Sequence, residues 1–206
     1  MGGRRVVITG MGAVTPLGCG IAAYWDGLIS ARSGITPITL FDSAPFDVRF
    51  GGECTGFNPG DYVDGRQAKR MDRFAQLAFA AAKMAVEEAA LVSGSFDPRR
   101  AGVIVGSGIG GIAELEEQHR RLIDKGPGRV SAFTIPKLMA NAAAGHISIG
   151  FGLQGVSTTV ATACASAGNA MGDAFNSIRS GAAEVIVTGG TEAALTPLGL
   201  AAFAAM

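Results

Sequence analysis

The chain has 206 residues, 48% of them hydrophobic, and its 17 lysines and arginines balance its 17 aspartates and glutamates. This length and apolar content suffice for one domain with a sizeable buried core. The zero net charge argues against a surface that binds nucleic acid or acidic membranes, and no apolar run reaches the roughly 18 residues that a membrane span needs.

The first half of the chain predicts short elements followed by a long helix. Residues 4–9 are rich in β-branched side chains and predict a strand that ends at glycines. A helix is expected over residues 21–30, whereas the prolines and glycines between residues 41 and 61 predict irregular surface structure. Across residues 67–91, apolar side chains recur at spacings of three and four, which predicts an amphipathic helix.

The second half alternates strands and helices. Strands are expected at residues 101–105, 156–161 and 184–188, with helices at residues 112–124, 136–149 and 165–180. Because each strand lacks a polar face, the pattern predicts a largely parallel sheet that helices cover on both sides. With no internal linker and no short-period repeat, we interpret the chain as one α/β domain.

Residues 106–111 read Gly-Ser-Gly-Ile-Gly-Gly, which matches the GxGxxG dinucleotide fingerprint between a strand and a helix. No second strand that ends in an acidic residue follows at the required distance. We therefore favour a glycine turn that lets the backbone approach a ligand or a neighbouring helix, and we expect no cofactor.

The histidines and cysteines predict no metal site. His119 lies in a polar helix and His146 near the end of an alanine-rich one, so structural roles are expected for both, and no ligand cluster surrounds them. Cys19, Cys54 and Cys164 are odd in number and widely spaced, which fits neither a disulfide framework nor a zinc site. The start of the chain lacks the apolar segment of a secretory signal, so we expect a reducing cytoplasm.

Cys164 is the candidate nucleophile. A β-branched strand leads into it, and a helix of small residues begins at once. A thiol on the first turn of a helix lies near free N–H groups and the positive end of the helix dipole, which favour the thiolate. The same N–H groups can hold an oxyanion. Position alone leaves open a second reading, in which Cys164 is a small buried apolar residue.

At these residues the sequence resembles the amino-terminal half of the elongating β-ketoacyl-acyl-carrier-protein synthases, the type II condensing enzymes of fatty-acid synthesis. The matches follow one another in order from end to end of the chain. They are residues 4–10, Phe41-Asp42, residues 106–111, Ala144-Gly145-His146, and residues 162–166, 189–192 and 196–199.

This resemblance implies a thiolase-like αβαβα architecture, of which the chain is the amino-terminal half with a mostly parallel mixed sheet, and it implies a homodimer. It also implies that Cys164 accepts an acyl group from acyl carrier protein and then condenses it with decarboxylating malonyl-carrier protein. The Cys164 N–H would form part of the oxyanion hole. Ile109 and Phe203 would line or gate the acyl pocket, and Phe133 would approach it across the dimer.

One departure from the family is large. The family's two catalytic histidines, a supporting lysine and the second oxyanion N–H come from the second half, whereas this sequence stops at Met206. We therefore expect residues 1–206 to be a single domain truncated before the second half, incomplete for full turnover. The acyl-chain length preference and the identity of the missing histidines stay open.

Two hypotheses remain. The chain is the nucleophile half of a condensing enzyme, or it is a non-catalytic relative that dimerises or binds carrier protein, as chain-length-factor partners do. The presence of Cys164 favours the enzyme, since such partners usually replace this cysteine. A thiolase acting on coenzyme A is disfavoured because its cysteine motif and position differ.

Overall fold

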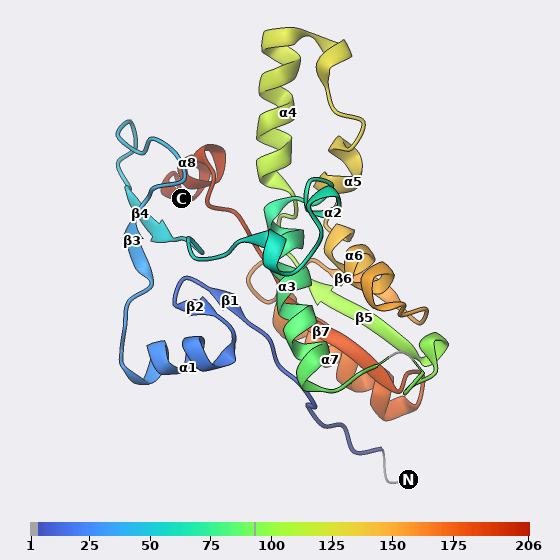
Figure 1. Ribbon diagram of the computed structural model, residues 1–206. Helices are drawn as coiled ribbons and strands as arrows, with labels where there is room; N and C mark the ends of the chain where they lie inside the picture. Colours follow the sequence, from blue (N-terminus) through green and yellow to red (C-terminus); the bar gives the residue numbers. More distant parts are fainter. Residues whose placement is uncertain (1–3, 93) are drawn as a thin grey trace.

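A three-stranded parallel sheet forms the centre of the computed structural model, which describes residues 4–92 and 94–206 (Figure 1). β5 (Ala101–Gly106) lies between β6 (Ser157–Val160) and β7 (Val185–Gly190). Val103 is in register with Ser157 on one side and with Val187 on the other. β5 is buried along its whole length, as its continuous apolar sequence predicts.

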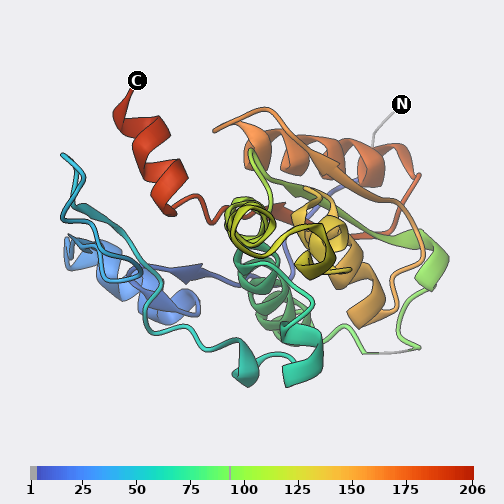
Figure 2. The same ribbon diagram turned by 90° about the horizontal axis from the view of Figure 1, so that it is seen from above.

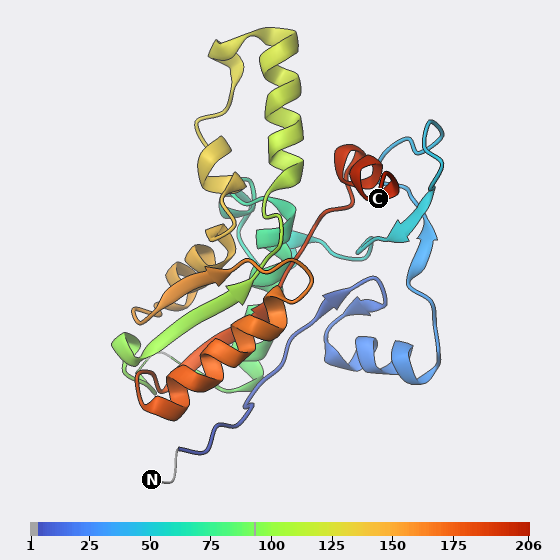
Figure 3. The same ribbon diagram turned by 180° about the vertical axis from the view of Figure 1, so that it is seen from behind.

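Helices cover both faces of this sheet. α7 (Ser166–Ser180) packs on one face, and α3 (Arg73–Glu88) and α6 (Ala142–Phe151) pack on the other (Figures 1 and 3). Successive side chains of a strand point to opposite faces. Val103 accordingly joins the cluster of α3 and α6, while Ile104 packs on two alanines of α7. The expected α/β class, with a parallel sheet that helices cover on both faces, is confirmed.

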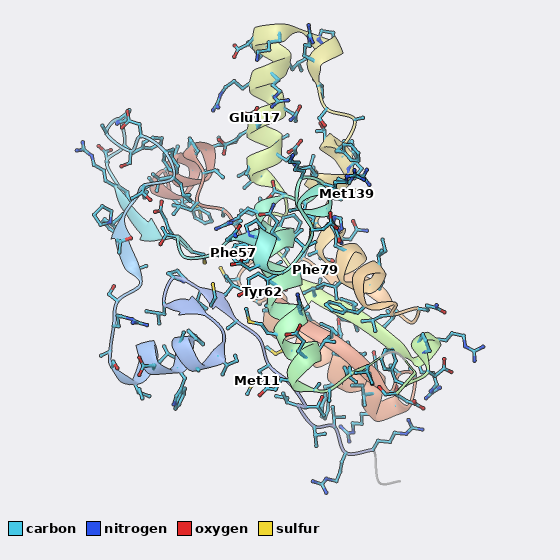
Figure 4. All side chains as sticks on the ribbon, viewed as in Figure 1. Met11, Phe57, Tyr62, Phe79, Glu117 and Met139 are labelled. Atoms are coloured by element: carbon cyan, nitrogen blue, oxygen red, sulfur yellow. The ribbon has the colours of Figure 1, made fainter. Side chains whose placement is uncertain are left out.

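The main core lies between β5, α3 and α6. Phe74, Val103 and Ile147 are the largest fully buried side chains. The ring of Phe79 stacks on that of Phe151, with centroids 5.3 Å apart, and Figure 4 shows Phe79 on α3. Burying one such side chain stabilises the fold by about 1.5–3 kcal/mol.

An arm lies to one side of this core (Figure 2). It contains the hairpin of β1 (Val14–Thr15) and β2 (Gly18–Cys19), then α1 (Ile21–Ile29), then the hairpin of β3 (Ile35–Pro37) and β4 (Phe50–Gly52). Many of its large apolar side chains are exposed, among them Trp25, Leu28, Ile29, Ile35, Leu40 and Phe50. The arm therefore contributes less to the buried core than the sheet does.

The structure describes seven further helices outside these layers. They are η1 (Pro59–Asp61), α2 (Gly65–Ala68), η2 (Pro98–Arg100), α4 (Ile112–Lys125), η3 (Pro127–Arg129), α5 (Thr134–Leu138) and α8 (Pro197–Ala204). α4 projects from the end of the sheet, and Figure 4 marks it at Glu117. None of the helices that the structure describes is long and apolar enough to cross a membrane.

The strand predicted at residues 4–9 is wrong. This segment forms no strand, and Val7 and Ile8 are 64% and 81% exposed. β-branched composition favours a strand only where a partner strand supplies hydrogen bonds, and none of the described strands pairs with this segment. The chain instead approaches α3, where the N–H of Met11 donates to the Glu88 carboxylate (Figure 4).

The two longest predicted helices are each divided. Residues 67–91 form α2 and α3 because Asp72 caps a new helix, its side chain accepting from the N–H of Phe74. Residues 136–149 form parts of α5 and α6 because Met139, with φ −57° and ψ 133°, is extended. Every other predicted helix or strand begins and ends within two residues of the observed one. The stretch predicted to be irregular contains the short strand β4.

Candidate active site

Cys164 lies in the turn between β6 and α7, at the carboxyl end of the sheet. We call residues 162–166 the nucleophile turn. Ala163 has a φ of +51°, a left-handed conformation that residues other than glycine adopt at a cost of about 1–3 kcal/mol. Cys164 is exposed. The reading of Cys164 as a buried apolar residue is therefore wrong, and the thiol is accessible to a substrate.

The Ser166 hydroxyl holds this turn through two hydrogen bonds. Ser166 is 3% exposed, and its Oγ accepts the N–H of Thr162 at 2.8 Å and donates to the carbonyl oxygen of Ala163 at 2.6 Å. Asn169, one turn further along α7, donates to the Thr162 hydroxyl at 2.7 Å. These bonds oppose the cost of the left-handed backbone, because relaxing the turn would break them and leave the buried Ser166 hydroxyl without its partners.

The glycine loop (residues 106–111) ends β5 and touches the nucleophile turn. A Cβ at Gly106 would lie 2.3 Å from the backbone carbon of Ser166, and a Cβ at Gly108 would lie 3.6 Å from the Cα of Ala163. The absence of a side chain at Gly106 is what allows the two backbones to meet. The expectation that these glycines let the backbone approach a neighbouring helix is confirmed.

The N–H groups of the glycine loop are already occupied. The Glu192 carboxylate accepts the N–H of Gly108 at 2.8 Å and that of Ile109 at 3.1 Å. The N–H of Gly110 donates to the Ser107 hydroxyl, and that of Gly111 to the carbonyl oxygen of Leu138. A dinucleotide phosphate needs such groups free. The geometry thus disfavours the dinucleotide reading of GxGxxG.

The other residues expected in an acyl pocket lie at different places. Ile109 belongs to the glycine loop, next to the nucleophile turn, and is 43% exposed. Phe133 caps α5 and lies under the Arg70 guanidinium, 5.1 Å from the ring centroid. Phe203 is exposed on α8. Among the described residues, no hydrogen bond or aromatic contact joins Phe133 or Phe203 to the nucleophile turn.

Neither histidine is bonded to Cys164 in the described part of the chain. His146 lies on α6, where burial lowers the pKa of its imidazole, partly opposed by a hydrogen bond with the backbone of Arg70. His119 lies on α4. Nor do the described residues contain a group of three or more histidine, cysteine or acidic side chains that could hold a metal ion.

A buried polar cluster links three helices beside this site. Asp72 accepts the N–H of Glu114, and the Glu114 carboxylate pairs with Lys137 of α5. Burial raises the pKa of Asp72, although its bonds with the backbone N–H groups of Glu114 and Phe74 oppose this shift. The cluster fixes α4 and α5 relative to α3 and thereby supports the glycine loop, which leads directly into α4.

A cavity of about 570 Å³ is lined by Glu192 and by residues of the arm, α3 and α4. Cys54 and Arg73 are among its lining residues. Burial raises the pKa of the Cys54 thiol, with a smaller opposing effect from Arg73. Cys54 is therefore a weaker nucleophile than an exposed cysteine, because the thiolate is the reactive form.

The sequence predicted Cys164 as the candidate nucleophile and a glycine turn at residues 106–111, but it did not predict the side chains that hold these two segments. A hydroxyl two residues after the cysteine could have been recognised, since serine often bonds its neighbouring backbone at a helix start. Glu192 follows β7, and the carboxyl ends of parallel strands meet at one edge of a sheet. This position predicts that Glu192 lies near the glycine loop, but it does not predict which N–H groups the carboxylate bonds.

Comparison with known proteins gives one consistent result. A family model for the β-ketoacyl synthase N-terminal domain matches residues 3–206. Among curated relatives, 3-oxoacyl-[acyl-carrier-protein] synthase 2 of Synechocystis is 46% identical over 98% of this chain and 48% of its own length. The enzyme of the same name from Staphylococcus aureus is 43% identical over 98% of this chain and 49% of its own length. The chain spans about half the length of these relatives.

Solved structures agree. The ishigamide ketosynthase/chain length factor is 32% identical, with a TM-score of 0.91 over 98% of this chain and 50% of its own. A type II polyketide ketosynthase, solved in complex with its acyl-carrier protein, is 26% identical, with a TM-score of 0.82 over 97% of this chain and 54% of its own. These likenesses confirm the thiolase-like fold expected from the sequence.

Proposed function

Because this chain belongs to the β-ketoacyl synthase family, as its N-terminal domain, we propose that it supplies the acyl-accepting cysteine of a 3-oxoacyl-[acyl-carrier-protein] synthase. The observation that carries the proposal is the exposed Cys164 on a tightly bonded turn at the start of α7. A nucleophile needs access to its substrate together with a fixed geometry, and this turn offers both.

In the proposed first step, the Cys164 thiolate attacks the thioester carbonyl of an acyl-carrier protein. A new carbon–sulfur bond forms, and the bond to the carrier's sulfur breaks, so that the carrier leaves as its thiol after taking up a proton. The Cys164 N–H would stabilise the oxyanion of the tetrahedral intermediate. Ile109 would border the acyl chain, because the glycine loop lies against the nucleophile turn.

In the proposed second step, malonyl-carrier protein loses carbon dioxide, and the resulting carbanion attacks the carbonyl of the acyl-cysteine. The carbon–carbon bond forms as the Cys164 thiolate leaves. This step needs donors for the enolate oxygen, which the family resemblance assigns to histidines outside this chain. We therefore expect the 206-residue chain to accept an acyl group without condensing it.

The test is to incubate the folded chain with acyl-carrier protein and to map the acyl group by mass spectrometry. We expect acylation at Cys164, its loss in Cys164→Ala, and its retention in the matched variant Cys54→Ala. Acylation of Cys54 or Cys19 in place of Cys164 would overturn the assignment. A folded chain that binds carrier protein without acylation would favour the non-catalytic alternative.

We further propose a homodimer in the cytoplasm. None of the described strands pairs with the outer edge of β6, and the β-strand residues Ser157 and Thr158 are exposed there. An uncovered edge offers hydrogen-bonding groups to another strand. The three free cysteines suit a reducing compartment. Light scattering should give twice the mass of one chain, and a stable monomer at micromolar concentration would contradict the dimer.

A further inference from the structure

In the glycine loop, the backbone N–H groups of Gly108 and Ile109 have Glu192 as their only hydrogen-bond acceptor among the described residues. On one side of them, Ser107 is fixed because its N–H donates to the carbonyl oxygen of Val160 at 3.1 Å. On the other side, the N–H of Gly111 donates to the carbonyl oxygen of Leu138 at 3.1 Å. Between these anchors, the N–H of Gly110 also donates to the Ser107 hydroxyl at 3.1 Å. Only the N–H groups of Gly108 and Ile109 depend on a side chain from another part of the described chain.

One oxygen atom of Glu192 accepts both bonds. The Oε2 atom lies 2.8 Å from the nitrogen of Gly108 and 3.1 Å from that of Ile109. Two successive N–H groups that converge on one oxygen form a small anion-binding concavity, and a carboxylate strengthens such bonds by its charge. The carboxylate thus fixes the backbone that carries the Ile109 side chain.

Glu192 is itself placed firmly by the residue before it. The N–H of Thr191 donates to the carbonyl oxygen of Gly106 at 2.9 Å, and its hydroxyl donates to that of Phe74 at 2.6 Å. Phe74 is fully buried in the core. The backbone that carries Glu192 is therefore fixed by the sheet and by α3, although the Glu192 side chain is exposed.

We propose that Glu192 is a positioning residue that determines how long an acyl chain the site accepts. This inference rests on the proposed function, because it assumes that Ile109 borders the acyl chain on Cys164. With Oε2 in place, Ile109 is held against a growing chain. Without it, the two N–H groups lose their partner, the segment between its anchors becomes mobile, and Ile109 yields to longer chains.

The test compares loading of butanoyl- and dodecanoyl-carrier protein onto Cys164. Glu192→Ala should raise dodecanoyl loading relative to butanoyl loading by about tenfold, the lower end of what one pocket contact contributes to selectivity. Glu192→Gln should keep the wild-type ratio, because its amide oxygen can accept both bonds. Glu184→Ala, an exposed glutamate at the other end of β7, is the matched control and should leave the ratio unchanged.

Ile109→Phe serves as the positive control, since a larger side chain should lower dodecanoyl loading by about tenfold or more. If Ile109→Phe changes the ratio and Glu192→Ala does not, the inference is wrong while the proposed function stands. An equal loss of both substrates in Glu192→Ala would also overturn it, since that result indicates general destabilisation. If wild type acylates no cysteine, the proposed function itself fails.

Hydrogen exchange tests the placement of the loop independently of acylation. Glu192→Ala should speed exchange of the Gly108 and Ile109 amides by about tenfold or more, since a lost hydrogen bond changes a local opening equilibrium by that order. Glu192→Gln should leave their exchange close to that of wild type. Unchanged protection in Glu192→Ala would show that the carboxylate does not hold the loop.

Discussion

The glycine loop and the nucleophile turn end neighbouring parallel strands, but they are held in different ways. The nucleophile turn is exposed and is tied by Ser166, a hydroxyl within the turn itself. In the glycine loop, the exposed residues Gly108 and Ile109 are held by Glu192, which lies 84 residues after Gly108, while the other four residues are buried. The first arrangement is encoded locally, whereas the second exists only once the sheet has assembled.

The largest effect should come from the point where the two turns meet. Gly106→Ala places a Cβ 2.3 Å from a backbone carbon of Ser166, and backbone on both sides has little room to move. We expect a loss of about 3 kcal/mol in the free energy of unfolding, measured in urea. Overpacking typically costs about 1–3 kcal/mol, and here the added methyl group meets backbone atoms, which move less easily than side chains.

Gly108→Ala is the matched control for this variant. Its Cβ would meet the end of the flexible Glu192 side chain at 3.0 Å, and the next atom only at 3.6 Å. We expect it to cost less than about 1 kcal/mol. Equal losses in the two variants would mean that the two turns do not depend on close backbone contact at Gly106.

An intermediate effect should come from Ser166→Ala, which affects the nucleophile turn alone. The variant leaves the partly buried N–H of Thr162 without its partner and removes the bond that holds Ala163, so we expect a loss of about 1–2 kcal/mol. Alkylation by iodoacetamide should also become less selective for Cys164 over Cys54, because the relaxed turn no longer holds the Cys164 thiol in a fixed position. The bonds between Glu192 and the glycine loop should remain.

Ser180→Ala at the other end of α7 is the control for this experiment. Its hydroxyl bonds the carbonyl oxygen of Ser177 on the surface, and we expect a change within about 0.5 kcal/mol. If Ser166→Ala were no more damaging than Ser180→Ala, the turn would not depend on its own hydroxyl.

These two turns also show what a sequence can predict. β5 and α7 were located correctly because a continuous apolar run and a stretch of small residues are local signals. The position of Cys164 between a strand and a helix could be predicted because the three are adjacent in sequence, while its role as the nucleophile stays a prediction. The bonds of Glu192 were not foreseen, since no local pattern specifies which side chain meets an N–H group 84 residues away.

The errors have the same origin. The strand expected at residues 4–9 has the right composition but no partner among the described strands. The helix expected over residues 67–91 follows an apolar period that continues across a break at Asp72, where a side-chain cap begins a new helix. A missing strand partner in the first region and a side-chain cap in the second decided the structure against the local preference.

The smallest effect should come from pH, through His146 on the helix that leads to β6. Burial keeps the pKa of His146 below its usual value of about 6.5, so the unfolded chain binds a proton more readily than the folded chain as pH falls. The contribution of His146 to stability should be complete above that value and decrease as pH falls below it. Because a single proton is involved, the slope cannot exceed about 1.4 kcal/mol per pH unit.

Urea unfolding of His146→Gln between about pH 7.5 and 5.5 provides the comparison, since these values bracket the ordinary imidazole pKa. The variant should lose the part of the slope that His146 supplies, while carboxylates that titrate at lower pH act equally on both proteins. Identical slopes would indicate that the imidazole is protonated as readily in the folded as in the unfolded chain.

The central position of β5 also bears on how this chain folds during synthesis. Ala101 leaves the ribosome 84 residues ahead of Val185, its partner in β7, and Val103 leaves 54 residues ahead of Ser157, its partner in β6. Until then, an apolar strand destined to be buried on both faces has no native neighbour, and contacts over such separations form slowly. In the interval between the synthesis of β5 and that of its partner strands, aggregation of the nascent chain competes with folding. A chaperone that shields β5 would act in this interval.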